Sequence, residues 1–72
     1  MKTEKINYNG TSLDVDVISS DTFCVHLDRR DIHLQYRQDN EGADHWVDLD
    51  TNDETDESMK LGEALEPLLQ QA

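Results

Sequence analysis

The sequence predicts an α+β fold, in which a five-stranded antiparallel meander sheet packs one face against a C-terminal helix. Apolar and polar residues alternate with a period of two through residues 5–49, which is typical of strands with one buried face. Short turn-like segments interrupt this alternation, and after residue 53 the apolar spacing becomes that of a helix. The 72 residues are expected to form a single domain, 1–72, because such a short chain has no room for two cores.

Five strands are expected, and their short connections predict that consecutive strands are antiparallel neighbours. They lie near residues 4–8, 11–18, 22–27, 32–37 and 45–50. Asn9-Gly10 lies between two alternating segments and predicts a two-residue hairpin, because both turn positions need a positive φ. In the last strand, alternation directs Val47 and Leu49 toward the helix and Trp46 toward the opposite, open face, unless Trp46 lies flat over the sheet edge or a bulge turns it inward.

The short turns also predict which residues face one another across the sheet. The expected pairs are Ile6 with Leu13, Lys5 with Asp14, Val17 with Phe23, Leu27 with Ile32, and Tyr36 with Val47. On the open face these pairs predict one polar row of Lys5, Asp14, His26, His33 and Asp50, and a second row of Asp16, Cys24, Gln35 and Asp48. In this arrangement His26 faces His33, and Arg37 lies beside Trp46.

One helix is expected over about 53–66, followed by a possible extra turn. Thr51 and Glu54 have the spacing of a capping box, and the acids after them favour a helix N-terminus. Leu61, Ala64, Leu65 and Leu68 form an apolar stripe. Gly62 is unfavourable within a helix but allows a close approach to the sheet, and Pro67 predicts a bend or an end.

The charge is strongly acidic, with 17 Asp and Glu against 6 Lys and Arg and a formal net charge of −11. Such a chain repels nucleic acids and anionic membranes, so the expected partner is a protein, with a basic surface if its charge matters. The polar N-terminal residues do not fit a signal peptide, and a lone cysteine, Cys24, fits a reducing compartment. We therefore expect a cytoplasmic protein that needs no cofactor and contacts neither nucleic acid nor membrane.

Residues 46–59 begin like a calcium loop, with Asp48, Asp50 and Asn52 at alternate positions. An EF-hand also needs glycine at position 6 and glutamate at position 12, where this chain has Asp53 and Met59. We interpret the segment instead as a strand that leads into an acidic helix start.

The polar row on the open face has three interpretations. It is a solvated face in which histidines pair with carboxylates, a site for Zn²⁺ or another transition metal, or a pH-responsive or partner-contact surface. The candidate metal ligands are His26, His33, Asp50 and Asp14, with Cys24 as a further donor. Ligands on a flat sheet run parallel, and no CxxC or HxxxH spacing supports the metal interpretation.

We do not expect an enzyme, because the Cys24–His26 pair on an open strand has no oxyanion hole and the three scattered glycines form no phosphate-binding loop. The preferred function is a small acidic interaction module that binds a protein partner through the open face. Its expected contacts are Trp46, Arg37, His26 and His33. The alternative is an acidic decoy that mimics nucleic acid, since residues 39–57 hold nine acids and no Lys or Arg. The uncovered face and two free sheet edges are compatible with a monomer or a weak homodimer.

Overall fold

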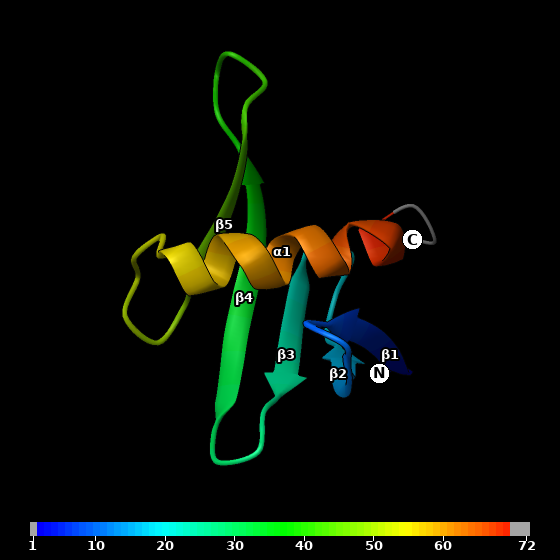
Figure 1. The fold of residues 1–72 in the computed structure, drawn as a ribbon. Coiled ribbons are helices and arrows are strands. Elements are labelled where there is room, and N and C mark those ends of the chain that lie inside the picture. Colours follow the sequence, from blue (N-terminus) through cyan, green and yellow to red (C-terminus); the bar gives the residue numbers. More distant parts are fainter. Residues whose placement is uncertain (1, 70–72) are drawn as a thin grey trace.

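The computed structural model describes residues 2–69 and shows five antiparallel strands in one sheet, crossed on one face by a single helix (Figure 1). The elements are β1 (Lys2–Tyr8), β2 (Thr11–Val17), β3 (Thr22–His26), β4 (Asp31–Gln38), β5 (Asp44–Asp48) and α1 (Asp56–Leu69). The strands lie side by side in chain order, so the predicted α+β meander is confirmed. The helix of the described chain lacks the length and the apolar character that a membrane span requires.

The β1–β2 hairpin forms as the Asn-Gly signal predicts. Asn9 has φ 52° and Gly10 has φ 76°, the left-handed values of a two-residue hairpin turn. Tyr8 therefore faces Thr11, Ile6 faces Leu13, and Lys5 faces Asp14. The predicted register across β2 and β3 is also confirmed, with Val17 opposite Phe23 and Asp14 opposite His26.

The β3–β4 turn is tighter than predicted. The Leu27 amide donates to the Arg30 carbonyl over 2.9 Å, so only two residues lie at the turn. The predicted Leu27–Ile32 pair is therefore wrong by two positions, and Val25 faces Ile32 instead. A two-residue shift leaves every side chain on its predicted face, but it places Asp31 rather than His33 opposite His26.

The β4–β5 register differs from the prediction by one residue, which exchanges the two faces of β5. Tyr36 faces Trp46 instead of Val47, and Arg37 faces His45 instead of Trp46. Trp46 is consequently in the core with 2% of its surface exposed, and the expectation that it lies on the open face is wrong. By alternation, Val47 lies on the open face.

The core consists of apolar side chains from all five strands and the helix. The buried cluster contains Ile6, Leu13, Val15, Phe23, Val25, Ile32, Leu34, Trp46, Leu61 and Leu65. The indole of Trp46 has its ring centroid 5.8 Å from that of Phe23 and 5.4 Å from that of Tyr36. On its helix side the indole packs against Gly62, where a Cβ atom would overlap the ring. The predicted close approach at Gly62 therefore exists, and Trp46 is the group that requires it.

The helix begins three residues later than predicted and continues through Pro67 to Leu69. The capping box is formed by Thr55 and Ser58, not by Thr51 and Glu54. The Ser58 amide donates to Thr55 Oγ1 over 3.0 Å, and the Thr55 amide donates to Ser58 Oγ over 2.8 Å. The hydroxyl of Ser58 also lies 2.7 Å from the Trp46 carbonyl, so the same residue attaches the helix start to β5.

The segment that resembles a calcium loop forms a closed turn between β5 and α1. The Asp48 amide donates to the Asp53 carbonyl over 2.9 Å, and Asp48 Oδ1 accepts from the Asp50 amide over 2.9 Å. Asn52 adopts φ 58° within this turn. The acids at its start thus have structural roles as turn formers, while Asp56 and Glu57 lie in the first turn of the helix.

The two edges of the sheet differ in how they are protected. At β5, the Trp46 amide donates to Glu54 Oε2 over 3.1 Å, and the Asp48–Asp53 bridge occupies a further amide. At β1, Lys2 and Glu4 form a surface ion pair at 2.8 Å. Charged side chains discourage edge pairing less completely than a chain segment that covers the edge. A homodimer through a sheet edge stays a prediction, and β1 is the edge that offers it.

We expect Gly62→Ala to destabilise the fold by about 1–3 kcal/mol, although alanine favours helix by roughly 1 kcal/mol over glycine. The new Cβ atom would overlap the indole at its Cγ atom, the root of the side chain, which cannot move without β5. Urea unfolding followed by far-UV circular dichroism measures the change. Glu63→Ala, at the adjacent exposed position, is the control and should stay within about 0.5 kcal/mol of the wild type. Equal or greater stability of Gly62→Ala would contradict the packing of the indole against this glycine.

Candidate functional site

The candidate site is the open face of the sheet, the face opposite α1. Within residues 2–69 the one helix, α1, lies on the other face of the sheet (Figure 1). One row runs across four strands as Lys5, Asp14, His26 and Asp31, and a second row runs as Thr3, Asp16, Cys24 and His33. The first row thus contains Lys5, Asp14 and His26 as predicted, but the residue opposite His26 is Asp31, and the row does not continue through His33 to Asp50. In the second row the Asp16–Cys24 pair is as predicted, whereas Gln35 faces Val47 and Asp48 faces Leu34.

His26 lies between two carboxylates that contact both nitrogens of its ring. Nδ1 is 2.9 Å from Asp31 Oδ1, and Nε2 is 2.9 Å from Asp16 Oδ2. A carboxylate oxygen only accepts hydrogen bonds, so the doubly protonated imidazolium satisfies both contacts. The hydrogen bonds to Asp16 and then to Asp31 raise the pKa of His26 above 6.5. The bonds from His26 and then from Thr3 lower the pKa of Asp16 below 3.8.

Asp14 takes a different role from the one predicted for it. It faces His26 in the strand register, but the imidazole contacts Asp16, two residues farther along β2. Asp14 instead forms an ion pair with Lys5, whose Nζ lies 3.5 Å from Asp14 Oδ1. Both side chains are well exposed, so this contact contributes little to stability.

His33 lies opposite Cys24 and contacts Asp50 as predicted. Its Nδ1 atom is 3.5 Å from Asp50 Oδ2, a separation typical of an ion pair and too long for a good hydrogen bond. The same nitrogen is buried and has no hydrogen-bond partner within the described chain. Asp50 reaches His33 from the turn after β5, since the Leu49 amide continues the ladder to the His33 carbonyl at 2.8 Å.

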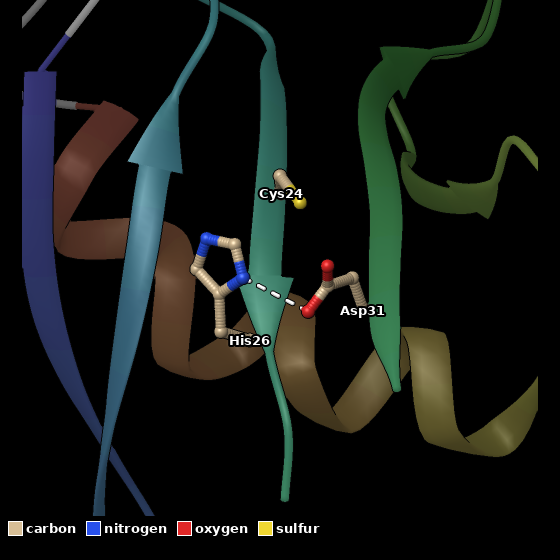
Figure 2. Close-up of side chains that lie close together, drawn as sticks. All are labelled: Cys24, His26 and Asp31. Carbon is tan, nitrogen blue, oxygen red and sulfur yellow. Dashed lines mark hydrogen bonds and ion pairs between the residues drawn. The ribbon is translucent and has the colours of Figure 1, made fainter. Parts of the chain in front are cut away.

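Cys24, His26 and Asp31 form the one group of three metal-ligating side chains that residues 2–69 bring together. One potential ligand atom from each lies within 4.8 Å of the other two, and the three side chains gather over β3 and β4 (Figure 2). Burial, followed by the charges of Asp31, Asp16 and Asp50, raises the pKa of the Cys24 thiol above 9.0. Of the predicted metal ligands, His26 and the further donor Cys24 belong to this group, whereas Asp31 was not among the predicted ligands. His33, Asp50 and Asp14 lie in separate ion pairs.

His45 is the site residue that the sequence patterns did not indicate. Nε2 lies 2.9 Å from Asp39 Oδ2, and Nδ1 lies 3.0 Å from Glu54 Oε2. The hydrogen bonds to Asp39 and then to Glu54 raise the pKa of His45 above 6.5. The bond from His45, followed by bonds from the Ala43 and Glu41 amides, lowers the pKa of Asp39 below 3.8. Successive residues of a strand point to opposite faces, so placing Trp46 in the core would have placed His45 on the open face.

Arg37 is exposed on the open face, where it faces His45 across the strand pair. Its Nε donates to Gln35 Oε1 over 2.7 Å. A shallow hollow of about 290 Å³ lies beside it and is lined by Arg37, Gln38, Asp39, His45, Val47 and Glu54. The predicted placement of Arg37 beside Trp46 is wrong, because the indole lies on the other face of the sheet.

No protein-family model matches the chain, and neither a curated protein nor a solved structure matches it significantly. The basis for a proposed function is therefore the geometry and charge of the open face.

We expect His45→Gln to lower stability more at pH 5.5 than at pH 8.5. A folded-state pKa above the unfolded value of about 6.5 adds stability that is complete below that value and lost as pH rises through the folded pKa. The groups that face His45 are Asp39, Glu54 and Arg37. Urea unfolding of both proteins at the two pH values measures the difference.

Glu41→Gln, in the loop that precedes β5, is the control for His45→Gln. Only the backbone amide of Glu41 contacts the cluster, through Asp39 Oδ1, so this side-chain change should shift stability equally at pH 5.5 and pH 8.5. An effect of His45→Gln that is equal at the two pH values, or larger at pH 8.5, would show that the two carboxylates do not stabilise the imidazolium.

Proposed function

We propose that this chain is a small, non-enzymatic, cytoplasmic interaction module that binds a basic protein surface through the open face of its sheet. The observation that carries the proposal is the combination of an uncovered five-stranded face with carboxylates held in fixed positions on it. Asp16 and Asp31 are fixed by His26, and Asp39 and Glu54 by His45. Lys5 and Arg37 are the permanent cations of this face, so acids outnumber them.

The fixed carboxylates favour a specific docking surface over a diffuse negative charge. A side chain that is already ordered loses less conformational entropy when a partner binds. Electrostatic complementarity of this kind determines orientation and association rate more than affinity. Apolar contact on the same face is available from Leu49, which is 37% exposed and follows β5 opposite His33.

The contacts proposed for the module change with the position of Trp46. The indole is in the core, so we no longer assign it to the partner surface. Arg37, His26 and His33 remain on the open face and remain proposed contacts, joined by Asp14 and Asp50 as the most exposed acids beside them.

The decoy alternative receives less support, because several acids of residues 39–57 form hydrogen bonds or ion pairs with other side chains of the same chain. Asp39 and Glu54 bind His45, Asp44 accepts from the Tyr36 hydroxyl, and Glu57 pairs with Arg30. A nucleic-acid mimic needs an array of acids that face outward toward a basic cleft. These acids instead fix a hairpin loop, a turn and a helix start.

The test compares two variants of equal net charge, one altered on each face of the molecule. Asp14→Asn/Asp50→Asn neutralises two exposed acids of the open face, and Glu63→Gln/Glu66→Gln neutralises two exposed acids of the helix. The probe is a short peptide of alternating arginine and glycine, with affinity measured by isothermal titration calorimetry at low salt. We expect roughly a two- to thirtyfold loss for the open-face variant, the equivalent of two exposed ion pairs, and little loss for the helix variant.

Amide shifts in ¹⁵N-HSQC spectra locate the peptide independently of its affinity. We expect shifts on β2, β3 and β4, which decline as the Debye length shortens with added salt. Equal losses in the two variants would show that net charge alone attracts the peptide. Shifts confined to residues 39–57 would favour the decoy instead.

A further inference from the structure

We propose that Cys24, His26 and Asp31 form a Zn²⁺ site, in which Cys24 Sγ, His26 Nδ1 and one Asp31 carboxylate oxygen are the ligands and water fills the fourth position. The three donors are the thiolate, imidazole and carboxylate groups that zinc binds in proteins. A site with three protein ligands and an open fourth position is an established arrangement for this ion.

The strand register brings the three side chains together. Cys24 and His26 are two residues apart on β3 and therefore share a face, and Asp31 lies directly opposite His26 on β4. The Leu27–Arg30 hydrogen bond next to this pair makes His26 and Asp31 a non-hydrogen-bonded pair, the type in which side chains lie closer together. The three ligands thus come together from two neighbouring strands (Figure 2). The expectation that ligands on a flat sheet run parallel did not include this arrangement.

The distances are close to those that the ion requires. Zn–N and Zn–O bonds of 2.0–2.1 Å and a Zn–S bond of 2.3 Å give separations of about 3.3–3.6 Å between ligand atoms in a tetrahedron. His26 Nδ1 and Asp31 Oδ1 are 2.9 Å apart, and all three ligand atoms lie within 4.8 Å of one another. Small side-chain rotations therefore suffice to admit the ion.

Asp16 supplies the supporting contact that a metal-binding histidine normally has. Its Oδ2 lies 2.9 Å from His26 Nε2, so it accepts the hydrogen bond from that nitrogen and leaves Nδ1 to the ion. Asp31 exchanges its contact with the Nδ1 proton for one with the cation. Binding releases the Cys24 thiol proton and the Nδ1 proton to solvent, while the Zn–S and Zn–N bonds form.

The second carboxylate-bound histidine provides a matched control within the same chain. His45 also lies between two carboxylates, Asp39 and Glu54, but it has no cysteine beside it. An ion attracted only by paired acids and imidazole would bind at both positions. An ion that requires the thiolate would bind only at Cys24.

The experiment titrates the full chain with Zn²⁺ in competition with a chromophoric chelator, for the wild type and four variants. We expect one equivalent to bind, and we expect Cys24→Ser and His26→Gln each to weaken binding by more than about 100-fold through loss of a ligand. Asp16→Asn should weaken it by roughly 10–100-fold through loss of the supporting contact. His45→Gln should match the wild type. ¹⁵N-HSQC spectra of each apo variant confirm that it is folded.

Co²⁺ reports directly on the sulfur ligand. The wild type should show a thiolate-to-cobalt charge-transfer absorption that Cys24→Ser lacks, and excess Ca²⁺ should leave the absorption unchanged because calcium prefers oxygen ligands. Failure to bind one equivalent of Zn²⁺ would overturn the proposal. Equal affinity of the wild type and a folded Cys24→Ser, or equal losses in His45→Gln and His26→Gln, would overturn it as well.

Discussion

The packing of the Trp46 indole against Gly62 determines how β5 and α1 fit onto the rest of the sheet. Burial of 150–250 Å² of aromatic surface contributes up to about 4–6 kcal/mol, against about 1.5–3 kcal/mol for a valine. Val47 is only 9% exposed in the observed register as well, so the two registers differ mainly in whether Trp46 or Leu49, here 37% exposed, is buried. The larger aromatic surface favours the register with Trp46 inside. The Ser58 hydroxyl at the Trp46 carbonyl and the Glu54 carboxylate at the Trp46 amide then hold the same residue from both ends.

This choice of register has consequences for the open face. With Trp46 inside, its neighbours His45 and Val47 lie on the opposite face, and His45 comes within reach of Asp39 and Glu54. Each of the three histidines of the chain thus lies beside at least one carboxylate. In a chain with 17 acids and 6 Lys and Arg, His26 and His45 act as additional cations where acids crowd together, because the carboxylates that they contact raise the pKa of each imidazole above 6.5.

The fold was predictable where one local signal determined the geometry, and it was not where two signals competed. Asn9-Gly10 permits one hairpin register, so β1 and β2 were predicted correctly. In β5 the adjacent Trp46 and Val47 are both apolar, so alternation alone does not decide which of them is buried. At the helix start, Thr51 with Glu54 and Thr55 with Ser58 both have capping spacing, and only the contact between Ser58 and the Trp46 carbonyl selects the second.

The candidate site was less predictable than the fold because it depends on register and not only on face. In the β3–β4 hairpin, a two-residue error left every inward and outward assignment correct, so the core was unaffected. Because of the same error, His33 was predicted opposite His26, where the structure has Asp31. Two adjacent histidines resist protonation of both rings, because the two positive charges would repel. Asp31 and Asp16 instead favour the protonated form of His26. The register error therefore reversed the expected charge preference at His26 without changing the architecture. A histidine in each of two neighbouring strands therefore indicates a polar face. The length of the turn between the strands determines which residues face each histidine, and so what that face can bind.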